Sequence, residues 1–280
     1  MQIITDIKQM QEIGNNWSNS QTIGFVPTMG YFHKGHLSLV AEANKNCDIT
    51  VVSIFVNPSQ FGPNEDFSSY PRDLQRDLEL LNQYKVDYVF NPTPDQMYPA
   101  GYKTWINVEE LSSILCGASR PGHFRGVATV ITKLINIIKP SLMFMGEKDF
   151  QQIVVLQTML KDLNFHTQIH PCPIIREADG LAMSSRNVYL NSEQRQQALC
   201  LSLAIKQAQE QYKQGIDDPQ ILKKNASDLI IRAGGRIDYI KFVDSVSLQE
   251  VKQAKDDTRI LLAVFIGKTR LIDNAALGSY

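Results

Sequence analysis

The sequence predicts an α/β protein, with a Rossmann-like, doubly wound parallel sheet followed by a smaller α+β C-terminal domain. Three observations lead to this prediction. Short apolar segments alternate with amphipathic helical patterns through the first half of the chain. One of these segments, 49–56, is almost continuously apolar and rich in β-branched residues, as expected of a parallel strand buried on both faces. Beyond about residue 175, two helical patterns are followed by three strand-like ones.

The elements of the first half follow from the spacing of apolar residues. The predicted strands are 22–26, 49–56, 86–90, 141–146 and 165–170. The predicted helices are 36–46, 72–83, 125–140 and 149–164. Pro140 ends the third helix, because proline has no N–H for the helical ladder. Strands that alternate with helices in this way favour a parallel sheet covered by helices.

The second half has a different order of elements. A long amphipathic helix is predicted over 191–215 and another over 219–234. The strand-like segments come after them, at 237–244, 260–267 and 269–277. Helices followed by strands are typical of a small α+β domain. We therefore expect an N-terminal domain over 1–175 and a smaller domain over 176–280.

Composition excludes several classes of protein. The chain has 280 residues, a formal net charge of −1 and no run of Lys and Arg, so a nucleic-acid-binding face is not expected. Its 4 cysteines are too widely spaced for a CxxC motif and indicate thiols in a reducing compartment. No apolar run approaches the roughly 20 residues of a membrane helix, and the N-terminus lacks a signal-peptide pattern. We expect a cytoplasmic protein without membrane or nucleic-acid partners.

The most informative stretch is FVPTMGYFHKGHLSLV, residues 25–40. A short loop carrying Gly30, His33, Gly35 and His36 joins a predicted strand to a predicted helix. Such junctions bind nucleotides, because the helix N-terminus presents N–H groups and partial positive charge to phosphate. Glycine lets the backbone approach a ligand, and imidazoles supply donors to phosphate oxygens. Two alternatives stay open: the histidines cap or pack the helix, or they ligate a metal.

Further polar clusters follow the predicted strands. They are Asn57 with Gln60, Lys148 and Asp149 with Gln152, and Ser184 and Ser185 with Arg186. Because the carboxyl ends of parallel strands meet at one edge of a sheet, one pocket there would gather the first two clusters with the loop. Each cluster has a plain alternative: an ordinary turn, a surface ion pair and a helix cap, respectively. For Arg72 and Asp77, the plain alternative is a position on a solvated helix face.

The His-Lys-Gly-His segment resembles the H-x-G-H signature of the nucleotidyltransferase superfamily, which implies attack on the α-phosphate of a nucleotide with pyrophosphate leaving. With PTMGYFHKGH, FVNPSQFGPNEDFSSYPR, RPGHFRGV, MGEKDFQQ and READGLAMSSRNVYL, the sequence closely resembles the pantothenate synthetase (pantoate–β-alanine ligase) family over about residues 22–190. The resemblance implies an ATP-dependent ligase that joins pantoate to β-alanine through a pantoyl adenylate, in pantothenate biosynthesis. Pyrophosphate and AMP are the implied by-products.

The resemblance also implies roles for individual residues. His36 is the implied catalytic histidine, His33 assists it, and Lys148 neutralises charge at the α-phosphate. The implied ATP-binding residues are Met29, Gly30, Tyr31, Phe32, His33, Lys34, Gly35, His36, Gly146, Glu147, Lys148, Asp149, Ile175, Met183, Ser184, Ser185 and Arg186. The implied residues for pantoate and β-alanine are Asn57, Gln60 and Gln152. Asp77 matches a position associated with Mg²⁺, although its neighbours Arg76 and Leu80 are not ligand types.

The resemblance further implies a homodimer, with ATP as co-substrate and Mg²⁺ as cofactor. The loop departs from the usual Gly-Ala-Leu-His of the family, since Tyr31 and Phe32 are bulkier. We expect this departure to change the pocket wall and not the reaction. Two other functions remain open. One is another nucleotidyltransferase, which leaves the nucleotide on its product; the other is a nucleotide-binding relative without turnover.

Overall fold

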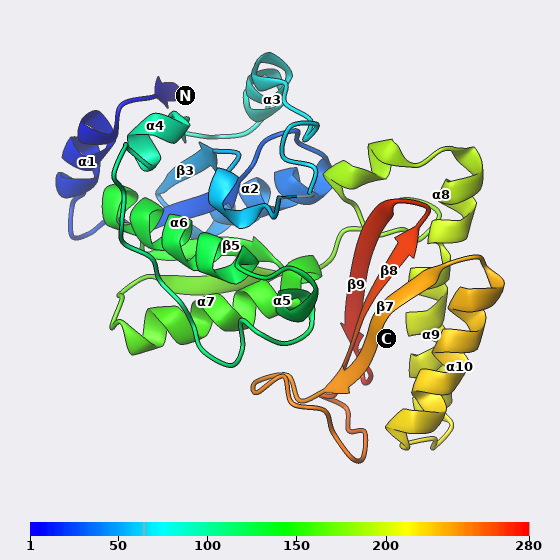
Figure 1. Ribbon diagram of the computed structural model, residues 1–280. Helices are drawn as coiled ribbons and strands as arrows, with labels where there is room; N and C mark the ends of the chain where they lie inside the picture. The colour runs from blue at the N-terminus through cyan, green and yellow to red at the C-terminus, as the bar shows by residue number, and fades with distance from the viewer. Residues whose placement is uncertain (64, 280) are drawn as a thin grey trace. The chain divides into compact units, whose positions relative to one another are not determined.

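The computed structural model describes residues 1–63 and 65–279. The chain separates into two compact units, Met1–Glu147 with Gln152–Pro173 and Lys148–Gln151 with Ile174–Tyr280. The first unit contains a parallel sheet and the second an antiparallel one (Figure 1). The predicted fold class is therefore confirmed.

The sheet of the first unit has six strands among the described residues, in the order β1-β4-β3-β2-β5-β6. Every pairing between these neighbours is parallel. The strands are β1 (Gln2–Ile4), β2 (Ile23–Thr28), β3 (Ile49–Ile54), β4 (Tyr88–Phe90), β5 (Leu142–Gly146) and β6 (Gln168–Cys172). The central strands β2 and β3 are buried along most of their length, which explains their continuous apolar runs.

Helices cover both faces of this sheet (Figure 1). They are α1 (Ile7–Asn15), α2 (Lys34–Asn46), α3 (Leu74–Leu81), α6 (His123–Ile138) and α7 (Phe150–Asp162), with the short α4 (Pro94–Met97) and α5 (Cys116–Ser119). Right-handed crossovers put α2 and α3 on one face and α1, α6 and α7 on the other. α1 packs on α6.

The strand order reverses direction between β2 and β5, and this reversal locates the binding crevice. The chain leaves β2 for α2 on one face and leaves β5 for α7 on the other. In open α/β sheets, ligands bind outside the carboxyl ends of two such strands, because the diverging connections leave a gap there. Strand β2 ends at Thr28 and β5 ends at Gly146, so the predicted motifs begin beside this gap.

The second unit builds its core between an antiparallel sheet and helices. Its sheet has the order β7-β8-β9, formed by β7 (Arg236–Val243), β8 (Arg259–Ile266) and β9 (Thr269–Ala276). The helices are α8 (Ser192–Ala198), α9 (Cys200–Lys213) and α10 (Pro219–Arg232). Apolar residues of α9 and α10, such as Leu201, Ala204 and Ile230, pack with Ile260 and Leu262 of the central strand. This half thus has a core of its own.

Four elements differ from the sequence-based predictions. Strand β1 and helix α1 are absent from those predictions. For β1 the reason is its length, because a three-residue edge strand has too few positions to display a period. The helix predicted over 191–215 is interrupted at Leu199, where the N–H bonds back three residues instead of four. The strand predicted over 165–170 begins only at Gln168, because Asn164 has a φ of 55° and turns the chain out of α7.

The described part of the chain contains no helix of the length and apolar character that a bilayer requires.

Candidate active site

The loop between β2 and α2 adopts a left-handed backbone, with φ values of 79° at Gly30 and 52° at Tyr31. Glycine is required at position 30 for two reasons. Positive φ favours glycine, and a Cβ there would lie 2.8 Å from Oδ2 of Asp77. Thr28 closes the start of the loop, since its hydroxyl donates to the Ser53 carbonyl (2.6 Å) and accepts the Gly30 N–H (3.2 Å). The loop is thus attached to its own strand and to the neighbouring one.

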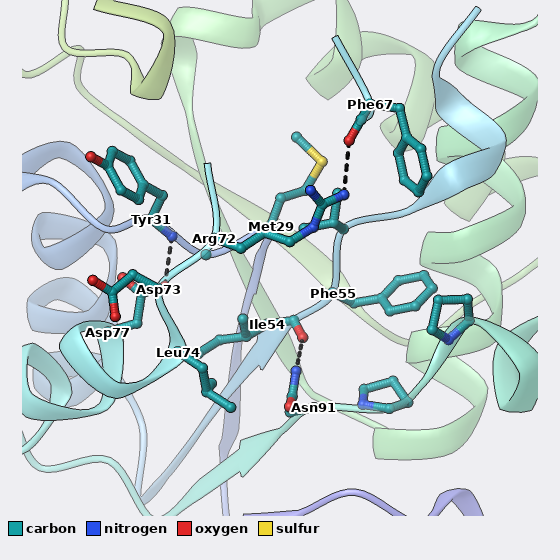
Figure 2. A pocket seen from close by; sticks show the side chains of 14 residues that line it. Met29, Tyr31, Ile54, Phe55, Phe67, Arg72, Asp73, Leu74, Asp77 and Asn91 are labelled. Carbon is teal, nitrogen blue, oxygen red and sulfur yellow. Dashed lines mark hydrogen bonds between the residues drawn. The ribbon is translucent and has the colours of Figure 1, made fainter. Parts of the chain in front are cut away.

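Asp77 of α3 holds the next two residues of the loop. Its side chain is 1% exposed, so the solvated-face alternative is wrong for this residue. Its carboxylate accepts the Tyr31 N–H at 2.6 Å (Figure 2) and the Phe32 N–H at 2.7 Å. Burial raises the pKa of this carboxyl, and the two N–H bonds act in the opposite direction. Phe32 itself packs in the core of the first unit.

Both histidines of the motif lie at the N-terminus of α2. His33 is the N-cap, and its Nδ1 accepts the Gly35 N–H at 3.1 Å. An accepting Nδ1 leaves the proton of the neutral ring on Nε2. The ring of His36 stacks on that of His33 with centroids 4.1 Å apart. Two imidazoles therefore stand at the positive end of a helix dipole, where an anion is favoured.

The turn after β3 presents Gln60 to this loop. Asn57 is 1% exposed, and its Oδ1 accepts from the hydroxyls of Ser59 (2.8 Å) and Tyr98 (2.9 Å). Its Nδ2 donates to Oε1 of Gln60 at 3.0 Å. Nε2 of Gln60 then lies 3.1 Å from Sδ of Met29. Asn57 therefore orients the Gln60 amide, and the amide reaches the first residue of the loop.

Helix α6 meets this turn at Gly126. The Gly126 carbonyl accepts from Nδ2 of Asn57 at 3.2 Å. A Cβ at this position would lie 2.3 Å from the Ser59 carbonyl oxygen and 2.7 Å from the Gln60 nitrogen, closer than real contacts allow. The absence of a side chain thus lets the helix backbone support the turn directly.

Gly126→Ala is expected to lower the free energy of unfolding by about 1–3 kcal/mol, because the added methyl overpacks this contact. In an exposed helix, a Gly→Ala change would raise the free energy of unfolding by up to ~1 kcal/mol. A decrease therefore indicates that the added methyl group collides with the turn. Denaturant unfolding measures the change. An unaltered or raised stability would contradict the close approach of α6 to Ser59 and Gln60.

Sequence reasoning assigned no role to three residues that close the other side of the turn. Nδ1 of His123 lies 2.9 Å from the Gln60 carbonyl oxygen. Arg120 donates two hydrogen bonds, of 2.7 and 2.6 Å, to the carboxylate of Glu65. Burial works against ionisation of Glu65, and the bonds from Arg120 outweigh it and lower the pKa of this group. The local signal for these residues was the family resemblance, carried by RPGHFRGV for Arg120 and His123 and by FVNPSQFGPNEDFSSYPR for Glu65.

A cavity of about 260 Å³ adjoins the loop on the side of α3. Its wall is formed by Met29, Gly30, Tyr31, Ile54, Phe55, Val56, Phe67, Arg72, Asp73, Leu74, Asp77, Asn91, Pro92 and Pro94 (Figure 2). The guanidinium of Arg72 donates to the Phe67 carbonyl and the Asn91 amide to the Ile54 carbonyl. Tyr31 thus forms part of the wall of this cavity, whereas Phe32 is buried in the core and does not line it.

The segment after β5 begins the second unit. Nζ of Lys148 lies 3.4 Å from Oδ1 of Asp149, so the ion pair that the sequence left open is present. The Lys148 carbonyl accepts from the Asn274 amide at 3.0 Å. Arg259 donates to Oδ1 of Asn274 at 2.6 Å, and its guanidinium stacks on Phe150, 3.7 Å from the ring centroid. This short helical turn is therefore fixed to strands β8 and β9.

The predicted Ser-Ser-Arg segment follows a tight hairpin of the second unit. The Met183 N–H donates to the Ile175 carbonyl at 2.9 Å, next to a bridge between Arg176 and Ala182. Ser184 caps the 3₁₀ helix Ser185–Tyr189, since its hydroxyl accepts the Arg186 N–H at 3.2 Å. Ser184 is therefore a helix cap.

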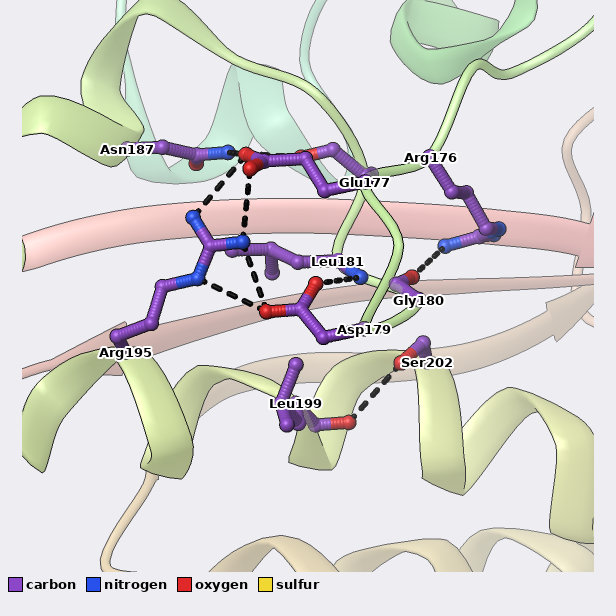
Figure 3. Close-up of polar contacts among 10 residues, drawn as sticks. Arg176, Glu177, Asp179, Gly180, Leu181, Asn187, Arg195, Leu199 and Ser202 are labelled. Carbon is purple, nitrogen blue, oxygen red and sulfur yellow. Dashed lines mark hydrogen bonds and ion pairs between the residues drawn. The ribbon is translucent and has the colours of Figure 1, made fainter. Parts of the chain in front are cut away.

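Arg195 of α8 fastens this hairpin (Figure 3). Its guanidinium lies 2.8 Å from a carboxylate oxygen of Glu177 and 2.8 Å from one of Asp179. These hydrogen bonds lower the pKa of both carboxyls. The Asn187 amide donates to Glu177 at 2.9 Å, which ties the 3₁₀ helix to the same cluster. The segment is therefore fixed on both sides of Ser184.

The carboxylate of Asp77, at the position that the resemblance associates with Mg²⁺, is engaged by two backbone N–H groups, one on each oxygen. Within residues 1–63 and 65–279, no group of three or more His, Cys, Asp or Glu side chains is arranged to hold a metal ion. The metal alternative for His33 and His36 finds no third ligand among these residues either.

The predicted site residues thus fall into two groups. The first unit holds Met29 to His36, Asn57, Gln60, Gly146, Glu147 and Gln152. The second holds Lys148, Asp149, Ile175 and Met183 to Arg186. In the first group, the Gln60–Met29 contact joins the turn to the loop.

Comparison with known proteins gives the family. The model of the pantoate-beta-alanine ligase family matches residues 2–276. The chain belongs to this family. The pantothenate synthetases of Geotalea uraniireducens and Pseudothermotoga lettingae are similar to it, with 52% identity over 280 residues and 50% over 279, and 99% of each chain is covered.

Solved structures of the pantoate-beta-alanine ligase family agree with this fold. A pantothenate synthetase of Thermus thermophilus is similar with a TM-score of 0.95 and 38% identity over 100% of both chains. The ligase of Francisella tularensis, complexed with beta-gamma ATP and beta-alanine, has a TM-score of 0.83 and 39% identity, and the match covers 100% of this chain and 99% of that one. The family is thus shown by sequence and by structure.

Proposed function

We propose that this chain condenses pantoate with β-alanine to pantothenate, with consumption of one ATP and through a pantoyl adenylate. The observation that carries the proposal is membership of the pantoate-beta-alanine ligase family over residues 2–276. The loop from Met29 to His36 also supports the proposal, because it lies at the N-terminus of α2, where a phosphate group is favoured.

The reaction has two steps. In the first, a carboxylate oxygen of pantoate attacks the α-phosphorus of ATP, and the bond to pyrophosphate breaks. In the second, the β-alanine amine attacks the acyl carbon, the bond to AMP breaks, and the amine gives up a proton. The first step joins an anion to a polyanion, so cationic groups and helix dipoles must offset the repulsion. The second step depends mainly on orientation, which contributes up to ~7–11 kcal/mol.

In this proposal, ATP lies along three segments of the chain. The imidazoles of His33 and His36 and the N-terminus of α2 interact with its phosphates, and Lys148 neutralises charge at the α-phosphate. The other ATP ligands are Met29, Gly30, Tyr31, Phe32, Lys34, Gly35, Gly146, Glu147, Asp149, Ile175, Met183, Ser184, Ser185 and Arg186. Any Mg²⁺ accompanies ATP through its phosphate oxygens.

Pantoate binds through amides. Gln60 and Gln152 hydrogen-bond its hydroxyls and carboxylate. We assign Asn57 to this group through Gln60, because the polar atoms of the Asn57 side chain bond to protein groups, Oε1 of Gln60 among them. A neutral amide suits this task, since it accepts from the hydroxyls and donates to the carboxylate.

We further propose that residues 1–175 bind ATP and pantoate and that the domain over 176–280 closes over them, because a pantoyl adenylate must be kept from water. Binding of ATP and pantoate is then expected to slow amide hydrogen exchange in residues 176–190. Exchange measured by mass spectrometry tests this, with residues 219–232 of α10 as the internal reference. Equal rates with and without the two ligands would contradict closure.

The enzyme is proposed to act in the cytoplasm as a homodimer with small-molecule substrates. Sedimentation of the purified protein tests the dimer, and a monomer at all concentrations would contradict it.

Pyrophosphate release tests the function itself. ATP with pantoate is expected to give at most one equivalent of pyrophosphate per active site, and β-alanine is expected to convert this into steady turnover with free AMP. A product that retains the nucleotide would identify another nucleotidyltransferase. No pyrophosphate with any carboxylate would identify a binding protein without turnover.

A further inference from the structure

The loop that carries the two histidines is held from outside by one carboxylate. Asp77 lies 45 residues beyond Phe32, on α3, and it accepts the N–H groups of two successive loop residues at 2.6 and 2.7 Å. Successive N–H groups that converge after left-handed residues form a concave anion-binding nest. Here Gly30 and Tyr31 are the left-handed residues, and the N–H groups of Tyr31 and Phe32 form the nest. The side chain of Asp77 fills it.

The surroundings leave this contact little freedom. The carboxylate is buried, and it accepts two charge-assisted hydrogen bonds at the short end of their range. A Cβ at Gly30 would lie 2.8 Å from its Oδ2, so the loop approaches the carboxylate as closely as a glycine permits. The residue next to it, Arg76, donates to the Phe32 carbonyl at 3.0 Å and lies 5.0 Å from the Tyr31 ring centroid. Helix α3 thus holds the backbone of Tyr31 and Phe32 through two N–H groups and one carbonyl group.

The contact has a direct consequence for the site. His33 follows Phe32 and caps α2, and the ring of His36 stacks on that of His33. A change in the 31–32 backbone therefore moves both imidazoles relative to the end of β2. A displacement of about 1 Å in such a group reduces turnover by about 100-fold.

We propose that Asp77 is a positioning residue for the phosphate-binding loop, which sets the place of His33 and His36, and that it is not a ligand of Mg²⁺. The proposal rests on the proposed function in that the loop is taken to bind ATP. It deepens that function by assigning the task of fixing the loop to a residue of another helix.

Asp77→Asn tests the proposal, because the amide keeps the size of the side chain and turns one acceptor into a donor that faces an N–H group. We expect turnover to fall by about 100-fold and the KM for ATP at saturating Mg²⁺ to rise by about tenfold. The KM for β-alanine and the Mg²⁺ concentration for half-maximal activity stay as in the unaltered enzyme. Amide exchange at Tyr31 and Phe32, read by NMR, accelerates. Glu79→Gln, an exposed carboxylate on the same helix, is the matched control and changes none of these quantities.

Three outcomes would overturn the proposal. They are unchanged turnover in Asp77→Asn, activity restored by more Mg²⁺, and unchanged exchange at residues 31 and 32. If Asp77→Asn does not fold, Arg76→Met is the second variant, because it removes the hydrogen bond to the Phe32 carbonyl from an exposed position. We expect turnover, the KM for ATP and amide exchange at residues 31 and 32 to change in the same direction as in Asp77→Asn, by a smaller factor. If the unaltered protein releases no pyrophosphate, the proposed function fails, whereas the exchange measurement still decides whether Asp77 holds the loop.

Discussion

Replacing His36 with alanine is expected to lower turnover by about 10²–10³-fold without unfolding the protein. Negative charge gathers on the oxygens around the α-phosphorus as pantoate attacks, and an imidazole at a helix N-terminus offsets it where water is excluded. Alanine continues the first turn of α2 with the highest helix propensity, so the helix itself is not at risk.

Steady-state release of pyrophosphate measures this effect, and thermal unfolding checks the fold. His166→Ala serves as the control, because it removes an exposed imidazole between α7 and β6. A second variant, His36→Asn, keeps a donor at this position and is expected to retain more activity than the alanine variant. Near-normal turnover in His36→Ala would mean that the reaction takes place in another pocket.

Replacing Lys148 with alanine is expected to have an effect of similar size, about 10²–10³-fold in turnover. In the proposed role, the ammonium group of Lys148 neutralises the α-phosphate in the transition state. The ion pair with Asp149 by itself gives no reason for a lysine at this position. As a surface ion pair alone, the Lys148–Asp149 contact would contribute under ~1 kcal/mol to stability and nothing to the rate. The two roles therefore predict opposite results for activity.

Stopped-flow release of pyrophosphate separates the steps for Lys148→Ala, since the adenylation step alone is expected to slow. Lys161→Ala, in the last turn of α7, removes an exposed ammonium group and is expected to leave both steps unchanged. A loss of stability in Lys148→Ala with normal adenylation would contradict the catalytic role and support the plain ion pair.

The sequence predicted the loop because its signal is local. Gly30, His33 and His36 occur within a few residues, and their types and spacing match the chemistry of phosphate binding. The parallel sheet was predictable for a related reason, since buried strands such as β3 are apolar at nearly every position. Local composition therefore determined both the fold class and the position of the candidate site.

The contacts that hold the loop were not predictable in this way. Asp77 and Phe32 are 45 residues apart, and one carboxylate on an amphipathic helix has the pattern of a solvated face. Gly126 likewise touches Ser59 and Gln60 across 67 and 66 residues, and only the backbone approach explains why it is a glycine. Such residues are specified by tertiary packing, which no window of neighbouring residues records.

The central claim is that the loop after β2 binds the phosphates of ATP with its two imidazoles. A crystal structure with a non-hydrolysable ATP analogue and pantoate tests it most directly. We predict phosphate density at the N-terminus of α2, within hydrogen-bonding distance of His33 and His36. Nucleotide density elsewhere, with both imidazoles turned into the protein interior, would contradict the account.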